Sequence, residues 1–385
     1  MNKKIGIITL YYNSLNFGGV LQAYALCEAL KQQGYNAEQI LVQREGVIKH
    51  RKKAWYEFFN LKKVIKKIIS VLKDKRKKRK NDTLSNIVEE RKLAFESFYN
   101  LVPHSKVFLE SKISDCLDNY DIFITGSDQV WSCGEINSPY FLGFVKEDKK
   151  KISYAASIGK MEVDIRLKEC FEYHLDKFNA VSVRESNAVS LLQPFTKNEV
   201  QFVLDPTLLL TSEDWNNLSS DRKIDFPYML CYFLGNDKSH RKLAKDYAKK
   251  HGLKIACFPH YPSDYHSADK KFGDFLLTDA SPQDFLALIK NAKVVLTDSF
   301  HASVFSWFFK RQFFTFGRKS HKGMEGRLYS LLEILNLKDR FVYNVNKNTL
   351  NYLESLEDID YNQDFDKYVE LKEKSINFLV NALKD

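Results

Sequence analysis

Residues 294–307 have the sequence VVLTDSFHASVFSW, and their character changes halfway. The apolar run VVL predicts a buried parallel strand, TDS predicts a turn that carries a helix N-cap, and the apolar residues that follow recur at helical spacing. His301 is therefore expected in the first turn of a helix, at the carboxyl end of a strand. Open α/β sheets bind ligands at that end, and a helix N-terminus offers free N–H groups to an anion. A lone histidine more often has a structural role, but this position makes His301 a candidate functional residue as well.

The same alternation of strand-like and helical patterns extends outward in both directions. It starts with a strand–helix–strand pattern at 5–42 and resumes at residue 228, after a turn-rich link. The pattern predicts an α/β protein with two Rossmann-like domains facing a cleft. We expect these domains at 1–211 and 212–362, followed by a C-terminal helix at 363–385.

The composition is that of a globular chain. Of its 385 residues, 44% are hydrophobic and 14% are aromatic, which argues against disorder. The N-terminal MNKKIGIITLYYN lacks a small-residue cleavage site, and no apolar run is long enough to span a membrane. Six cysteines are scattered without a CxxC pair, which argues against a zinc site or a disulfide framework. These features predict a cytoplasmic protein.

The positive charge is concentrated in one segment. Residues 49–80 contain 15 Lys/Arg against Glu57 and Asp74, a local net of +13, so the rest of the chain carries −3 of the total +10. Aromatic and aliphatic residues recur there at helical spacing, with lysines mostly between them. This pattern is typical of a helix that lies in a membrane interface, where basic residues attract anionic lipid. A solvated helix packed on the body is the alternative, and nucleic acid is disfavoured because no recognition motif accompanies the charge.

Two glycines precede the first predicted helix. A loop at 13–19 leads into a helix expected at 20–33, and it places Gly18 and Gly19 at the helix N-terminus. Missing side chains at these positions let a ligand approach the backbone. The loop lacks the GxGxxG pattern, so dinucleotide binding is weakly supported, and a tight turn explains the glycines equally well.

Candidate ligand-binding groups gather at the predicted strand ends and at a later loop–helix junction. They are Gly18, Gly19, Asp128, Arg184, His301, Arg318 and Arg327. Guanidinium groups match carboxylate and phosphate oxygens with paired hydrogen bonds, although each arginine could equally form a structural ion pair. The chain has no GxSxG, HExxH, Walker or DxD motif. The set therefore favours metal-independent transfer on an anionic small molecule.

Seven segments, in order, resemble the polysaccharide pyruvyl transferase family. They are NFGGVLQAYAL, ITGSDQVW, ISYAASIG, VSVRE, VLDPTLLL, TDSFHASVFSW and GRLYSLLEILNL, and they span roughly residues 5–337. The resemblance implies a glycosyltransferase-B-like fold, with the acceptor on the first domain and the donor on the second. It also implies transfer of an enolpyruvyl-derived unit from phosphoenolpyruvate to a sugar, without a cofactor or metal. The product would be a pyruvate ketal in a capsule, exopolysaccharide or cell-wall polymer.

The resemblance also implies roles for individual residues. His301 matches the family's catalytic histidine, and Asp128 matches an acidic residue near the acceptor. Arg184 matches an anion-binding arginine, with Arg327 as a further member. Several family members carry arginine two residues before the histidine, where this chain has Ser299, which we also take as a candidate substrate contact.

That departure leaves alternatives for the donor. Either Arg318, Lys319 or Arg327 replaces the missing arginine, or the donor is not phosphoenolpyruvate. A nucleotide-sugar-dependent glycosyltransferase of the B fold is the main alternative, and a non-catalytic polysaccharide- or membrane-binding relative is another. The basic segment at 49–80 suits a polyprenyl-diphosphate-linked acceptor and peripheral association with the inner face of the plasma membrane.

Overall fold

The computed structural model describes most of the chain. The described residues are 3–45, 87–132, 135–159, 162–259, 267–269, 271–318 and 325–384. The basic segment at 49–80, for which we expected a membrane-interface helix, lies outside them, as does Lys319. Within the described ranges, no helix has both the length and the apolar character needed to cross a bilayer.

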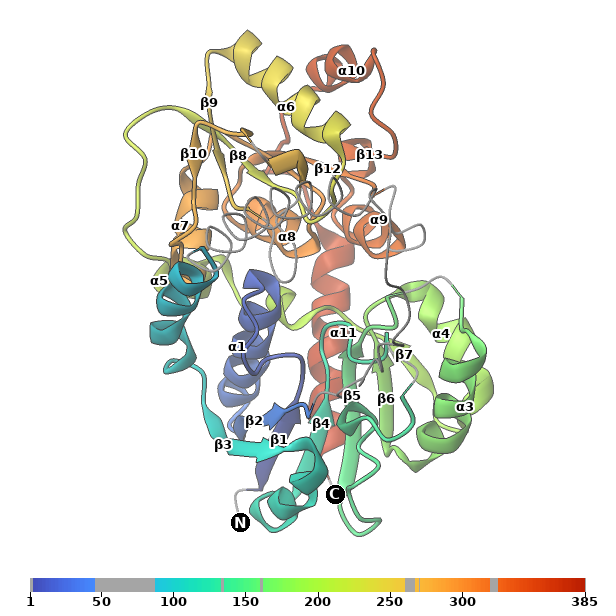
Figure 1. The fold of residues 1–385 in the computed structure, drawn as a ribbon. Helices are drawn as coiled ribbons and strands as arrows, with labels where there is room; N and C mark the ends of the chain where they lie inside the picture. Colours follow the sequence, from blue (N-terminus) through green and yellow to red (C-terminus); the bar gives the residue numbers. More distant parts are fainter. Residues whose placement is uncertain are drawn as a thin grey trace, which may run out of the picture.

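The first lobe is built on a seven-stranded parallel sheet with the order β3-β2-β1-β4-β5-β6-β7 (Figure 1). The strands are β1 (Lys4–Ile8), β2 (Asn36–Gln43), β3 (His104–Leu109), β4 (Ile122–Thr125), β5 (Lys150–Ala156), β6 (Ala180–Val183) and β7 (Val200–Phe202). Its helices are α1 (Phe17–Gln32), a helix at 87–99, α3 (Ile165–His174) and α4 (Ser186–Leu192). The strand order reverses between β1 and β4, which is where such sheets bind ligands.

The second lobe contains a six-stranded parallel sheet with the order β10-β9-β8-β11-β12-β13. Its strands are β8 (Tyr228–Tyr232), β9 (Lys254–Cys257), β10 (Phe275–Leu276), β11 (Val294–Thr297), β12 (Gln312–Phe316) and β13 (Phe341–Val342). The helices are α5 (Ser212–Leu218), α6 (Lys238–His251), α7 (Pro282–Asn291), α8 (Phe300–Phe308), α9 (Glu325–Ile334), α10 (Thr349–Ser355) and α11 (Asp366–Leu383). The two sheets and their helices confirm the predicted α/β class with two Rossmann-like lobes.

The lobes meet through an aromatic contact at the start of α1. The Phe17 ring stacks on Phe285 of the second lobe, with centroids 4.5 Å apart and an interplanar angle of 10°. It also makes edge contacts with Phe258 and Tyr232. The Arg91 guanidinium lies 4.5 Å from the centroid of the Phe17 ring, so a cation–π contact adds to these aromatic contacts. One hydrophobic cluster thus contains core residues of both lobes.

The last helix, α11, joins the lobes a second time. Figure 1 shows it (red) running from the second lobe down beside the first-lobe sheet. Tyr368 packs edge-on against Trp307 of α8 and donates a hydrogen bond to the Leu208 carbonyl oxygen at 2.9 Å. Farther along, the Ser375 hydroxyl accepts the Leu204 N–H at 2.9 Å. Because α11 contacts both lobes, it helps to fix their relative position.

The predicted start of the first helix is wrong. We expected a loop at 13–19 and a helix at 20–33, but α1 begins at Phe17. The reason is the cap at Asn16, whose side-chain Oδ1 accepts the Gly19 N–H at 3.1 Å. Gly18 and Gly19 therefore lie inside the first turn of the helix rather than before it.

Three edge strands, β3, β10 and β13, were not expected from the sequence. β10 and β13 have two residues each, which is too short for a periodic pattern to indicate a strand. β3 starts with the polar residues His104, Ser105 and Lys106, so its alternation is weak. All three strands depend on pairing with a neighbouring strand, which local sequence does not encode.

Candidate active site

His301 lies in the first turn of α8, immediately after β11, as the opening stretch predicts. The Ser299 side chain caps this helix by accepting the Ala302 N–H at 3.4 Å. The Thr297 hydroxyl accepts the Ser299 N–H and donates to the Tyr232 carbonyl oxygen. The turn is thus held by its own side chains, and buried Ser299 already has a structural use as the helix cap.

Gly18 packs against His301, which leaves no room for a side chain at residue 18. A Cβ atom at Gly18 would lie 2.0 Å from His301 Nδ1 and 2.5 Å from its Cγ. The imidazole of the second lobe therefore occupies the space that a side chain would need in the first lobe. At Gly19 a Cβ would meet Ser14 Oγ at 3.4 Å and Asp128 Oδ2 at 3.6 Å, which are ordinary contacts. At Gly18 the space left by the missing side chain is therefore filled by His301, and a substrate contact at Gly18 or Gly19 stays a prediction.

Arg184 links carboxylates from two other strand ends. It follows β6, and its buried guanidinium donates from Nη1 to Asp205 Oδ2 at 2.6 Å and from Nη2 to Asp128 Oδ1 at 3.4 Å. Burial opposes the charge, but Asp205 and Asp128 raise the pKa of Arg184 above its ordinary value. Asp128 follows β4 and retains 16% side-chain exposure, whereas Asp205 has none. Asp128 is therefore the carboxylate that remains accessible.

Asp205 is a site residue that the sequence reasoning missed. Its Oδ1 accepts the Thr207 N–H at 3.0 Å and the Thr207 hydroxyl at 2.7 Å, and Oδ2 also accepts the Ser127 hydroxyl at 3.1 Å. Oδ1 lies 3.7 Å from His301 Nε2. Burial works against ionisation, yet His301 and Arg184 hold the pKa of Asp205 well below its usual range. The available signal was an aspartate directly after a strand, which the following proline made look like a simple turn.

Two more arginines approach from the second lobe. Arg318 follows β12 and donates to the Asp298 carbonyl oxygen from Nε at 3.2 Å and from Nη2 at 2.7 Å. Arg327 comes from α9 and is buried. Burial and the nearby charges of Arg184 and Arg318 lower the pKa of Arg327 to about 9. The three predicted arginines therefore lie near one another, and their mutual repulsion favours an anion between them.

Four buried polar atoms of this site lack a hydrogen-bond partner among the described residues. They are Arg184 Nε, Glu185 Oε2, His301 Nε2 and Arg327 Nε. The pKa of Glu185 is raised because the carboxyl is buried, although the Ser157 hydroxyl donates to its other oxygen. Buried polar groups are nearly always paired in folded proteins, so the unpaired guanidinium nitrogens of Arg184 and Arg327 indicate a ligand site, whereas His301 Nε2 faces Asp205 Oδ1 at 3.7 Å.

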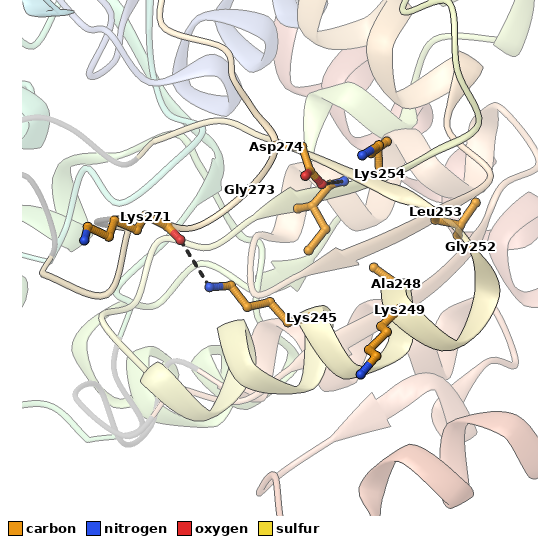
Figure 2. A pocket seen from close by; sticks show the side chains of 10 residues that line it. Lys245, Ala248, Lys249, Gly252, Leu253, Lys254, Lys271, Gly273 and Asp274 are labelled. Carbon is orange, nitrogen blue, oxygen red and sulfur yellow. Dashed lines mark hydrogen bonds between the residues drawn. The ribbon is translucent and has the colours of Figure 1, made fainter.

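One hollow of the described part of the chain lies away from the His301 cluster. It is a cavity of about 540 Å³. Its lining includes Lys245, Lys249, Lys254 and Lys271, whose side chains are drawn in Figure 2. It lies beside the amino end of β9, because Lys254 is that strand's first residue. Ligands of open α/β sheets bind at the carboxyl ends of the strands, so the cluster around His301 is the better candidate site. In the described ranges, no group of three or more His, Cys, Asp or Glu residues could hold a metal.

The order of these residues along the chain matches a known family model. The model described as "Polysaccharide pyruvyl transferase" matches residues 16–320, which include Gly18, Asp128, Arg184, Asp205 and His301. The chain belongs to the polysaccharide pyruvyl transferase family. Membership makes it a transferase of polysaccharide biosynthesis. A search of the curated proteins finds no match.

Solved structures show the same two-lobe fold at low sequence identity. UDP-N-acetylglucosamine 2-epimerase from Rickettsia bellii has a TM-score of 0.57 and 12% identity, covering 99% of this chain and 97% of its own. UDP-GlcNAc 2-epimerase from Methanocaldococcus jannaschii has a TM-score of 0.53 and 12% identity, covering 98% and 99%. This chain therefore has a glycosyltransferase-B-like architecture of two lobes.

Gly18→Ala is expected to destabilise the protein by about 1–3 kcal/mol, because the added Cβ overpacks the contact with His301. Urea unfolding measures the effect. Gly19→Ala is the matched control, since its Cβ makes only ordinary contacts. The double variant Gly18→Ala/His301→Ala should recover most of the loss, because the opposing ring is gone. Equal stability of the two single alanine variants would contradict the contact.

Proposed function

We propose that this chain transfers the enolpyruvyl unit of phosphoenolpyruvate to a sugar and closes a pyruvate ketal on two of its hydroxyl groups. The observation that carries the proposal is the gathering of Arg184, Arg318 and Arg327 around a histidine and an accessible carboxylate. Phosphoenolpyruvate has one carboxylate and one phosphate, and guanidinium groups bind both with paired hydrogen bonds.

Arg327 is the arginine with most to gain from an anion. Arg184 already pairs with Asp128 and Asp205, and Arg318 donates to a backbone carbonyl oxygen. Arg327 is buried near both cations, and its Nε has no hydrogen-bond partner among the described residues. An anionic donor would provide that partner and offset the repulsion. Arg327, helped by Arg318, is our choice for the charge-binding role left open at Ser299.

The reaction needs an acid for the donor and a base for the acceptor. His301 protonates the methylene carbon of phosphoenolpyruvate, and the π-electron pair forms the new C–H bond, leaving cationic character at C2. A sugar hydroxyl attacks C2 and gives its proton to Asp128. Phosphate then leaves with the electron pair of its C–O bond. A second hydroxyl oxygen forms the last C–O bond at C2, and its proton passes to the neutral His301 ring, which restores the acid. Asp128 suits the role of base because its carboxylate keeps solvent exposure that Asp205 lacks.

With phosphoenolpyruvate and an acceptor containing galactose or a hexosamine, the protein should release phosphate without added metal. His301→Ala should slow this release by about 100- to 10,000-fold, the usual contribution of a general acid. His104→Ala changes an exposed histidine on β3 and is the control. No release by the wild type, or an unchanged rate in the His301 variant, would refute the proposal.

The purified protein also allows a test that distinguishes pyruvyl transfer from the alternative, a nucleotide-sugar-dependent glycosyltransferase. Thermal-shift titration should show stabilisation by phosphoenolpyruvate. Stabilisation by UDP- or GDP-sugars, with none by phosphoenolpyruvate, would favour the alternative instead.

Arg327→Gln should raise KM for phosphoenolpyruvate about tenfold or more, because one charge-assisted hydrogen bond contributes roughly 1.5–3 kcal/mol. KM for the sugar acceptor should change little. Steady-state kinetics with each substrate varied in turn makes the comparison. Arg222→Gln is the control, since Arg222 pairs with Asp279 and Asp284 on the second lobe. An equal rise in both KM values would argue against a donor-specific role.

We further propose that the acceptor is a polyprenyl-diphosphate-linked oligosaccharide and that the segment 49–80 holds the protein at the anionic inner face of the plasma membrane. The local net charge of +13 supports this, since each basic residue near such a surface contributes about 1 kcal/mol.

Replacing the six basic residues at 75–80 with glutamine should weaken co-sedimentation with phosphatidylserine vesicles at least tenfold. The control replaces four exposed lysines of α6: Lys238, Lys242, Lys245 and Lys249. Vesicle binding that survives the change at 75–80 would exclude this segment as the membrane contact.

A further inference from the structure

The two nitrogens of the His301 ring have different surroundings. Nε2 is buried, has no hydrogen-bond partner among the described residues and faces Asp205 Oδ1 at 3.7 Å. Nδ1 is the ring atom nearest to Gly18: a Cβ there would lie 2.0 Å from Nδ1, 2.5 Å from Cγ and 2.7 Å from Cε1, distances that place Gly18 over the face of the ring rather than in its plane. The side chain as a whole keeps 10% exposure. Because Nε2 is buried, that exposure belongs to other atoms of the side chain.

Asp205 is held so that its carboxylate cannot turn away from the ring. Arg184 and Ser127 donate to Oδ2, and Thr207 donates twice to Oδ1. The same contacts stabilise the ionised form, which is reflected in the lowered pKa of Asp205. A carboxylate that stays ionised and fixed favours an N–H group, rather than a lone pair, on the nitrogen that faces it.

We propose that Asp205 is a positioning residue for His301: it keeps a proton on Nε2 and leaves Nδ1, beside Gly18, as the nitrogen that exchanges protons with the substrate. The consequence for the reaction rests on the function proposed above. In the first step the Nδ1–H bond breaks, its electron pair stays on Nδ1, and the proton forms a C–H bond at the methylene carbon. The neutral ring that remains carries its proton on Nε2, opposite the carboxylate of Asp205.

A purely structural role for Asp205 makes a different prediction. If the carboxylate served only to pair with Arg184, its loss would weaken the fold around β6 and β7 without changing where the His301 ring carries its proton. The tautomer of the neutral imidazole therefore separates the two roles, since it reports on the nitrogen that faces residue 205 and not on stability.

The experiment is long-range ¹H–¹⁵N NMR of ¹⁵N-histidine-labelled full-length protein in a pH series. The His301 signals are assigned by their absence from the His301→Gln spectrum. We expect the neutral ring of the wild type to be the Nε2–H tautomer. Asp205→Asn should move a substantial fraction to the Nδ1–H tautomer, because the amide can donate to Nε2. Phosphate release should fall at least 100-fold, with KM for phosphoenolpyruvate changed less than tenfold.

Asp269→Asn is the matched control. Asp269 also forms a buried pair with an arginine, at 2.7 Å from Arg241, but in the second lobe. It should leave both the His301 tautomer and phosphate release unchanged. Asp205→Glu restores the charge and should return the tautomer toward the Nε2–H form.

Each outcome decides the proposal. A wild-type ring protonated on Nδ1 overturns it without any variant, so the test does not require Asp205→Asn to fold. An unchanged tautomer in Asp205→Asn overturns it as well. A changed tautomer in a protein that releases no phosphate from phosphoenolpyruvate supports the positioning role of Asp205 while refuting the proposed reaction.

Discussion

The candidate site depends on one contact between the lobes, in which the His301 ring occupies the space of a missing side chain at Gly18. The neighbouring Phe17 ring stacks on Phe285, and α11 packs against both lobes. These contacts bury apolar surface on both sides, so the lobes share a core rather than meeting at a polar interface. Because His301 belongs to one lobe and Asp205 to the other, this packing sets the distance between them.

The carboxyl groups around Arg184 illustrate how burial separates chemically identical side chains. Asp205 is enclosed by donors and a cation, so its pKa is low. Glu185 is equally buried with fewer donors, so its pKa is raised. Asp128 keeps some contact with solvent. Carboxyl groups that differ in pKa and in exposure to solvent can take different roles within one site. Here Asp128 is the carboxylate that solvent can reach.

The elements that local pattern specifies were predicted well. The β11–α8 junction follows from an apolar run, a capping serine and helical spacing, all within a few residues, and it places His301 correctly. The start of α1 was missed because the cap at Asn16 resembles loop sequence until its hydrogen bond to Gly19 is known. Asp205 was missed because an aspartate before proline also suits a plain turn, and its partners lie 21 and 96 residues away along the chain, at Arg184 and His301.

The sequence by itself determined the alternation of strands and helices, the family to which the chain belongs, and the strand ends at which polar side chains appear. These depend on periodicity, capping and residue order, which are local properties of the chain. Only the tertiary structure decided that Gly18 accommodates an imidazole, that Ser299 serves as a helix cap, and that Asp205 faces His301 across the lobes. Such pairings arise when two separately specified lobes bury a common surface, and neither segment alone carries a signal for the partner it will meet.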